Sequence, residues 1–241
     1  MVTGRAGVGV VEVPSGFVVR RAPVLTVTAL AVAVVAAIVQ YAAPAVVPVL
    51  ERDGAALAQG QWWRWVTPLL VQTLGWHQIL ANLVALALIG LLGEWLLGRW
   101  RWAVLFAAGT LGGQVAAYAW HEPGGGASIA ICGLAGGMAV ALLVAPAPTP
   151  WLVAHPVIYY LAALTGWGFS GLFAAGVACL AAGLFLSGLR RARVRNAERI
   201  ALAGTVVCTF ALAAARDLHG VSLLSGMAVM VVILAGSRQK R

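Results

Sequence analysis

The sequence GGGASIAICGL at residues 124–134 places a glycine-rich loop directly before a long apolar segment, with Ser128 at the junction. A second polar side chain, His219, lies at the head of another apolar segment near the end of the chain. Polar groups are costly in lipid, so those at membrane depth usually have a function. A serine and a histidine at the ends of two membrane helices suit a reaction that takes place within the membrane.

The composition indicates a polytopic membrane protein of the all-α class. Apolar residues make up 62% of the chain and charged residues 10%, whereas soluble domains carry roughly 25% charged residues. The three cysteines, Cys132, Cys179 and Cys208, lie inside apolar segments without CxxC spacing, so neither a disulfide framework nor a metal site is indicated. We expect no metal and no cofactor.

The hydropathy pattern predicts about eight transmembrane helices in one bundle. The N-terminal tail covers residues 1–22, a single transmembrane domain covers 23–237, and a short tail covers 238–241. A cleaved signal peptide is the alternative for the first span, and a re-entrant segment is the alternative for residues 151–167. The expected spans are 23–43, 76–97, 102–120, 127–145, two within 151–189 separated by a break at 166–171, 199–215 and 217–236.

The basic residues predict the orientation, because they gather in cytoplasmic loops. They cluster at Arg20-Arg21, at Arg99 and Arg101, in 190–199 and in the C-terminal tail. Eight spans with both termini in the cytoplasm put every cluster inside, and put Ser128 and His219 at the same external face. This bias and the attraction to anionic lipid account for the net charge of +9, so we expect membrane lipids and no nucleic acid as partners.

Ser128 and His219 each allow a structural interpretation beside the catalytic one. Ser128 follows glycines that permit close approach of a substrate, and it starts a helix whose free N–H groups suit an oxyanion, but a serine there also caps helices. His219 is a possible base, but a histidine at an interface also snorkels. We interpret Asp217 as a solvated residue that faces away from His219, two positions along the helix.

Two amides share one face of the second span. Gln78 and Asn82 are four residues apart, so they project from the same side of a helix. They can donate to an oxyanion or bridge to a neighbouring helix. Glu94, in the other half of this span, is expected to be structural.

An ordered set of motifs runs along the chain: Trp63-Arg64, Asn82, Gly93-Glu94 with Gly98, Gly109 with Gly112, Gly126-Ala127-Ser128, and His219 with Gly226. This set resembles the rhomboid intramembrane serine proteases over residues 60–137 and 216–230. The resemblance implies a Ser–His dyad with Ser128 as nucleophile and His219 as base, an oxyanion site made of Asn82 and the backbone N–H of Ser128, and transmembrane protein substrates. It also implies that Trp63 and Arg64 anchor a loop in the outer leaflet. Gln78 and Gly126 are further candidates for oxyanion or substrate binding.

Three features depart from that family pattern. Ile129 replaces the usual glycine after the serine, Gln78 replaces the usual histidine, and a pair of spans at 151–189 is additional. Bulk at Ile129 is expected to crowd the serine. The alternatives are therefore a rhomboid-like pseudoprotease that binds clients without cleavage, and an unrelated membrane protein such as a transporter. The excess of arginine over lysine, with abundant alanine, valine and glycine, suggests a bacterial cell membrane.

Overall fold

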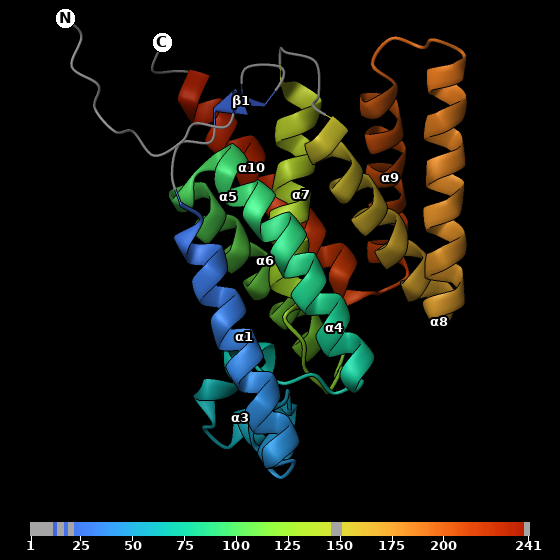
Figure 1. Cartoon of the computed structure of the whole chain (residues 1–241). Coiled ribbons are helices and arrows are strands. Elements are labelled where there is room, and N and C mark those ends of the chain that lie inside the picture. Colours follow the sequence, from blue (N-terminus) through green and yellow to red (C-terminus); the bar gives the residue numbers. More distant parts are fainter. Residues whose placement is uncertain (1–11, 14–16, 19–21, 146–150, 239–241) are drawn as a thin grey trace, which may run out of the picture.

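Helices form nearly all of the structure, a computed structural model that describes residues 12–13, 17–18, 22–145 and 151–238 (Figure 1). Two short strands, β1 (Glu12–Val13) and β2 (Phe17–Val18), pair antiparallel before the first helix. The predicted basic pair Arg20-Arg21, the proline-rich segment 146–150 and residues 239–241 lie outside the described residues. The N-terminal and C-terminal tails expected from the sequence therefore stay predictions.

The first helix is held at its beginning by an acidic side chain from another helix. In α1 (Val24–Ala42), the backbone N–H groups of Leu25 and Thr26 donate to the Glu94 carboxylate at 3.1 and 2.8 Å, and the Thr26 hydroxyl donates to it at 2.9 Å. The first N–H groups of a helix have no partner within the helix. Glu94 supplies one across the bundle, in agreement with the structural role expected for it.

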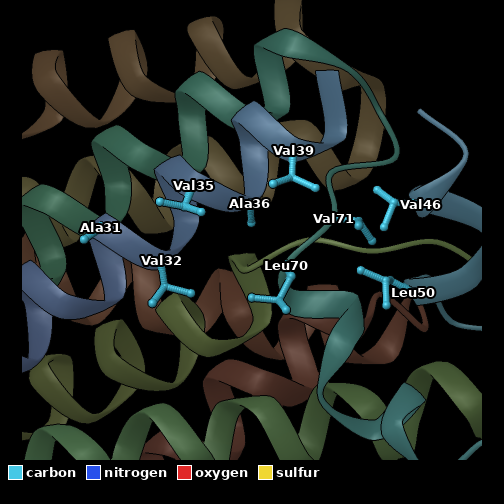
Figure 2. A pocket seen from close by; sticks show the side chains of 9 residues that line it. All are labelled: Ala31, Val32, Val35, Ala36, Val39, Val46, Leu50, Leu70 and Val71. Carbon is cyan, nitrogen blue, oxygen red and sulfur yellow. The ribbon is translucent and has the colours of Figure 1, made fainter. Parts of the chain in front are cut away.

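An apolar groove lies beside α1 on the surface of the bundle (Figure 2). Its volume is about 440 Å³. Aliphatic side chains line it throughout, which suits contact with lipid chains rather than water. The lining residues are Ala31, Val32, Val35, Ala36, Val39, Val46, Leu50, Leu70 and Val71.

Short helices fill the long connection after α1. They are α2 (Val46–Leu50), α3 (Gly54–Ala58) and the 3₁₀ helices η1 (Trp62–Trp65) and η2 (Thr67–Leu69). The second apolar segment then runs through α4 (Trp76–Ala85), a π-helical turn η3 (Leu86–Gly90) and α5 (Leu91–Leu97).

The remaining helices are α6 (Arg99–Ala119), α7 (Ser128–Val144), α8 (Trp151–Arg191), α9 (Ala197–Ala214) and α10 (Leu218–Arg238). The backbone of α8 leaves helical geometry at Ser170 and Gly171, where Gly171 has φ +75°, within the break predicted at 166–171. The two halves fold back on each other (Figure 1), and a Cβ at Gly166 would lie 2.6 Å from the Cα of Ala175.

The structure confirms an all-α, multi-pass membrane protein. Within the described residues, six helices are long and apolar enough to cross a membrane, among them the 41-residue, broken α8. The apolar α7 has 17 residues, which is at the short end for a span. The total of eight spans stays a prediction.

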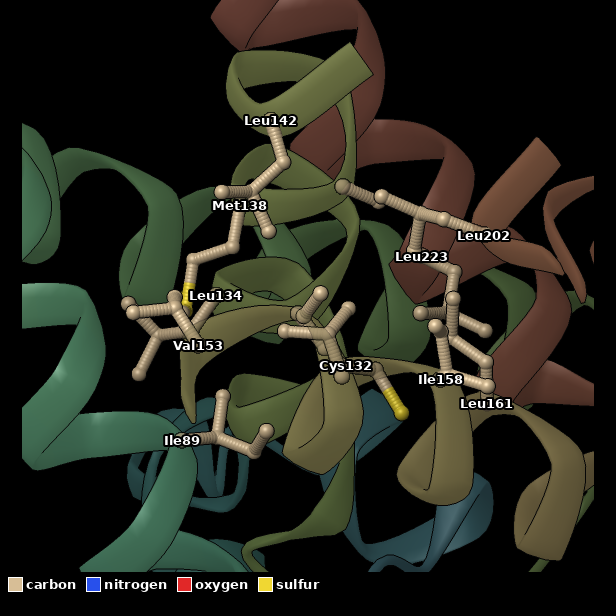
Figure 3. Close-up of a cluster of buried hydrophobic side chains, with 14 of the residues drawn as sticks. Ile89, Cys132, Leu134, Met138, Leu142, Val153, Ile158, Leu161, Leu202 and Leu223 are labelled. Carbon is tan, nitrogen blue, oxygen red and sulfur yellow. The ribbon is translucent and has the colours of Figure 1, made fainter. Parts of the chain in front are cut away.

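The core of the bundle forms around α7 (Figure 3). Glycines bring its neighbours close: a Cβ at Gly109 of α6 would lie 2.5 Å from the backbone of Gly133, and a Cβ at Gly226 of α10 would overlap the same residue. Membrane helices associate through such small residues because backbones can then approach closely. This packing sets the position of α10 against α7.

The charged turns and the loops around Ser128 lie at opposite ends of the bundle. Arg99, at the start of α6, donates to the carbonyl of Ala22 at 3.0 Å, beside the beginning of α1, and the α8–α9 turn lies at that same end (Figure 1). At the other end, the connection after α1 meets the loop before α7 through a backbone bridge between Arg52 and Gly124. The distribution agrees with the predicted orientation, which itself stays a prediction.

Candidate active site

The loop before Ser128 is pressed against the segment that precedes α4. Gly126 donates its N–H to the carbonyl of Pro68 at 2.8 Å and adopts φ +153°. A Cβ at Gly125 would lie 2.7 Å from the carbonyl oxygens of Pro68 and Val71. Only glycine allows this approach and this conformation without strain. The loop therefore delivers Ser128 to the first position of α7.

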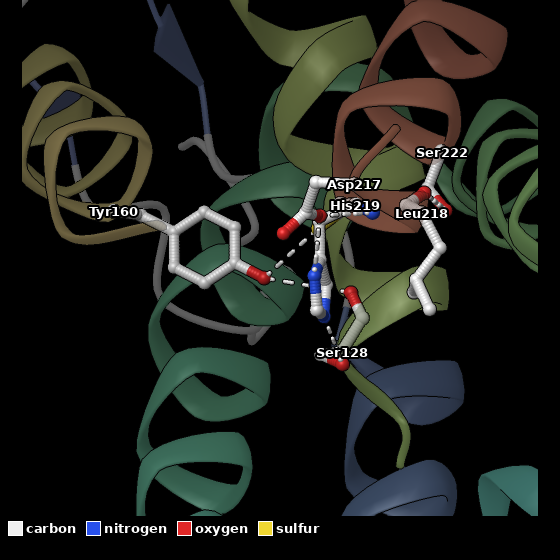
Figure 4. Close-up of polar contacts among 7 residues, drawn as sticks. Ser128, Tyr160, Asp217, Leu218, His219 and Ser222 are labelled. Carbon is white, nitrogen blue, oxygen red and sulfur yellow. Dashed lines mark hydrogen bonds and ion pairs between the residues drawn. The ribbon is translucent and has the colours of Figure 1, made fainter. Parts of the chain in front are cut away.

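Ser128 and His219 meet at the junction of α7 and α10 (Figure 4). The Oγ of Ser128 lies 2.8 Å from the Nε2 of His219, although the two residues are 91 positions apart. The glycine-mediated packing of α10 on α7 makes this distance possible. A hydroxyl at hydrogen-bond distance from an imidazole nitrogen has the geometry of a nucleophile and its base.

The interpretation of Asp217 as a solvated residue facing elsewhere is wrong. Its Oδ1 accepts from the backbone N–H of His219 at 2.7 Å and lies 2.9 Å from the Nδ1 of the same residue. The predicted helix began at residue 217, but α10 begins at Leu218. Asp217 is therefore the capping residue, and a cap folds its side chain back over the first turn.

The environment of Asp217 favours its ionised form. Burial opposes ionisation, but the hydrogen bonds and the charge of His219 outweigh it and lower the pKa of the Asp217 carboxyl below its ordinary value. The side chains of Asp217 and His219 are each 21% exposed, so this contact is partly screened by solvent.

The two predicted amides hold the approach to Ser128. Gln78 accepts from the N–H of Leu74 and donates its Nε2 to the carbonyl of Gly125, both at 2.9 Å. Asn82 donates its Nδ2 to the Oε1 of Gln72 at 2.6 Å. Each amide nitrogen has a second hydrogen, so the hydrogen bonds present leave one N–H of each for another acceptor.

Gly126 is the meeting point of this polar cluster. A Cβ there would lie 2.6 Å from the Nε2 of Gln78, 3.4 Å from the Oε1 of Gln72 and 3.5 Å from the Oγ of Ser128. The structure thus brings Gln78, Gly126, Ser128 and His219 together.

Ile129 does not crowd the serine as expected, because its side chain packs on α6. It is 1% exposed, and a Cβ at Gly113 would lie 2.8 Å from its Cβ and 2.7 Å from its Cγ2. The glycine on α6 leaves the space that the branched side chain occupies. The departure from glycine at this position is therefore accommodated by a matching glycine on the neighbouring helix.

Trp63, Arg64 and Glu94 lie away from the Ser128–His219 contact. Arg64 is 5% exposed and donates to the carbonyls of Glu51 at 2.6 Å and Pro48 at 3.1 Å. Trp63 donates to the carbonyl of Val49 at 3.4 Å. Both therefore stabilise the connection after α1.

The sequence argument missed Arg52, which joins the two loops at this end of the bundle. Arg52 donates to the carbonyl of Glu122 at 3.2 Å and to the Oε1 of Gln114 at 3.1 Å, and its own N–H donates to Gly124 at 2.7 Å. Burial lowers the pKa of the guanidinium. Its signal was an arginine between Glu51 and Asp53 in a loop, which does not reveal a tertiary partner.

Tyr160, from the first half of α8, was also missed. Its hydroxyl lies 3.5 Å from the carbonyl of Ser128 and 3.5 Å from the Sγ of Cys132 (Figure 4). The predicted additional pair of spans therefore contributes a side chain next to the serine. A tyrosine in an apolar helix gives no sequence signal of this contact.

Comparison with known proteins identifies a family that the chain matches. The model of the Rhomboid domain family matches residues 59–189, just over half of the chain. The Rhomboid protease GluP of Bacillus subtilis (strain 168) is 31% identical over 88 residues, which cover 36% of this chain and 17% of that protein. The chain thus spans less than a fifth of that relative. No solved structure matches.

Proposed function

This chain belongs to the rhomboid family, and we propose that it is an intramembrane serine protease that cleaves transmembrane segments of client proteins. The observation that carries the proposal is the 2.8 Å contact between the Oγ of Ser128 and the Nε2 of His219. The protease named among its relatives supports the same reaction class.

In the proposed first step, His219 takes the hydroxyl proton of Ser128 on its Nε2 while the Oγ bonds to the carbonyl carbon of the scissile peptide. The carbonyl π electrons move to oxygen and form an oxyanion. Collapse of this intermediate breaks the C–N bond, and His219 returns the proton to the leaving amine. Water then attacks the Ser128 ester with His219 again as base, which releases the carboxylic acid and restores the hydroxyl.

The proposed oxyanion site combines the N–H of Ser128 with the amide of Asn82. The first N–H groups of α7 are directed out of the helix, and a cavity of about 10 Å³ lies between Asn82, Gln72 and Ala127. The hydrogen bond from Asn82 to Gln72 fixes the amide before substrate binds, which is the condition for electrostatic stabilisation without reorganisation.

The proposed substrate is a client helix cleaved near the outer interface of the membrane. The Ser128–His219 contact lies towards the end of the bundle opposite the basic turns at Arg99 and 190–195 (Figure 1). A peptide bond within a helix must unwind before a nucleophile can attack it, so client segments with helix-weakening residues are favoured.

Labelling with a fluorophosphonate probe tests the proposal. The intact protein in detergent micelles should be labelled, and Ser128→Ala and His219→Ala should each abolish labelling while the unfolding temperature stays within a few degrees. Cleavage of a reconstituted transmembrane substrate should follow the same pattern. A folded protein that the probe does not label would contradict the proposal.

The second candidate is a pseudoprotease that binds client helices without cleaving them. It is favoured by Gln78, which stands where the family pattern has a histidine and which donates its Nε2 to the carbonyl of Gly125. The two candidates differ in one measurement, because a pseudoprotease retains a client in pull-down from the membrane but shows no labelling dependent on Ser128.

A further inference from the structure

We propose that Asp217 completes a Ser–His–Asp triad in this protein, as the positioning residue that selects the tautomer of His219. The inference rests on the proposed protease function, and it assigns to the site a third member that a Ser–His dyad lacks. It follows from the contacts of the carboxylate on three sides.

The two nitrogens of His219 have different partners. Nδ1 lies 2.9 Å from the Oδ1 of Asp217, and Nε2 lies 2.8 Å from the Oγ of Ser128. An ionised carboxylate only accepts hydrogen bonds, so Nδ1 must carry the proton of the neutral ring. Nε2 is then the acceptor, which is the state that a general base for Ser128 requires.

The carboxylate is itself held in position by the backbone. The N–H of His219 donates to Oδ1 at 2.7 Å, so the orientation of Asp217 is tied to the first turn of α10. The same oxygen therefore contacts the backbone and the ring of one residue, which limits rotation of the imidazole.

The third side of the carboxylate is covered by α8. A Cβ at Gly168 would lie 2.9 Å from the Oδ2 of Asp217, and 2.6 Å from the Cδ2 of Leu212. Gly168 thus leaves the space in which the carboxylate sits. This gives the first half of α8 a second connection to the site, beside that of Tyr160.

In the reaction, Asp217 would stabilise the imidazolium that forms when His219 takes the proton of Ser128. The proton stays on Nε2 until it passes to the leaving amine, and Asp217 does not take it up. The carboxylate contributes orientation and charge, and no bond to it forms or breaks.

The competing role for Asp217 is capping alone, and asparagine separates the two roles. Asparagine caps helices as well as aspartate does, so Asp217→Asn keeps the cap. With its Oδ1 on the N–H of His219, the asparagine still accepts from Nδ1–H, but it lacks the negative charge that stabilises the imidazolium. A capping role predicts full activity, whereas the triad predicts loss.

Asp53 provides a matched control on the same chain. It caps α3, accepting from the N–H of Ala56 at 3.0 Å, a contact that involves no histidine. Asp53→Asn should therefore leave the labelling rate unchanged. Gly168→Ala is the second test variant, because it perturbs the Asp217 carboxylate without changing any member of the triad.

The experiment measures the second-order rate of fluorophosphonate labelling, the unfolding temperature and the histidine ring ¹⁵N spectrum of the intact protein in micelles, with His219→Gln for assignment. We expect Asp217→Asn to lower the rate about tenfold, since a hydrogen bond to a charged group is worth about 1–1.5 kcal/mol more than a neutral one and about 1.4 kcal/mol is a factor of ten in rate. The proton of the neutral His219 ring should lie on Nδ1 in the wild type, the unfolding temperature should not change in Asp217→Asn, and Gly168→Ala should lower the rate more than Asp53→Asn.

Labelling of Asp217→Asn at the wild-type rate would overturn the triad and leave the protease function standing. A proton on Nε2 of His219 in the wild type would do the same. Absence of labelling in the wild type would overturn the protease function and the catalytic part of the triad with it. The ring spectrum would then still show whether the Asp217–His219 contact exists.

Discussion

Ile129 and Gly113 should behave as a coupled pair in a double-mutant cycle. Ile129 is 1% exposed and fills the space above Gly113, so Ile129→Ala leaves a cavity. Truncation of a buried isoleucine costs about 2–5 kcal/mol. Membrane helices lose mainly packing rather than transfer free energy, so we expect about 2 kcal/mol. Gly113→Ala overfills the same space and should cost about 1–3 kcal/mol.

The double variant should be more stable than the sum of the single variants predicts, because the new methyl group of Gly113→Ala enters the cavity left by Ile129→Ala. Coupling between contacting residues is about 0.5–3 kcal/mol. Unfolding in mixed micelles measures the three free energies. Ile131→Ala, at a residue that is fully buried on the same helix, is the control and should be additive with Gly113→Ala. If the unfolding free energies of Ile129→Ala and Gly113→Ala add to that of the double variant within about 0.5 kcal/mol, the packing argument is refuted. A large gain in substrate cleavage by Ile129→Ala would show that the side chain obstructs the serine.

Three further changes test the surroundings of the site. Asn82→Ala should reduce cleavage of a transmembrane substrate by about 10²–10³-fold, the usual cost of one oxyanion donor, with unfolding unchanged; full activity would remove Asn82 from the mechanism. Glu94→Gln should destabilise the protein by about 1–3 kcal/mol in the unfolding assay, because the charged acceptor for Thr26 and the start of α1 is lost; an unchanged unfolding free energy would contradict this. Gly126→Ala should lower labelling at least tenfold, since its Cβ would lie 2.6 Å from the Nε2 of Gln78 and strain the loop; labelling at the wild-type rate would count against a close fit there.

The apolar segments could be predicted from the sequence because each span satisfies its backbone internally and must be apolar along its length. The break in α8 was predictable for a related reason, since glycines at 166, 168 and 171 interrupt the long apolar stretch 151–189. Hydropathy does not encode which helices touch. The packing of the first half of α8 on α7, which brings Tyr160 to Ser128, therefore had no sequence signal.

The direction of polar side chains was predictable only where two of them lie on one short segment. Gln78 and Asn82 share a helix face, so their common direction followed from spacing. Their acceptors, Gly125 and Gln72, come from loops whose path depends on the whole bundle. For the same reason the sequence identified Asn82 as polar and functional but did not identify Gln72 as the side chain that orients it.

Asp217 illustrates how one residue of uncertainty in a helix boundary alters a functional conclusion. Inside a helix, residues two apart point about 200° apart, and an aspartate at that spacing cannot reach the histidine. At the cap, the backbone is not yet helical and the side chain turns back to the N–H groups of the first turn. Because the base of the site is itself in that first turn, the capping carboxylate reaches its ring at 2.9 Å. An acidic cap two residues before a histidine that starts a helix is therefore a sequence pattern in which helix capping and orientation of the imidazole are achieved by the same oxygen.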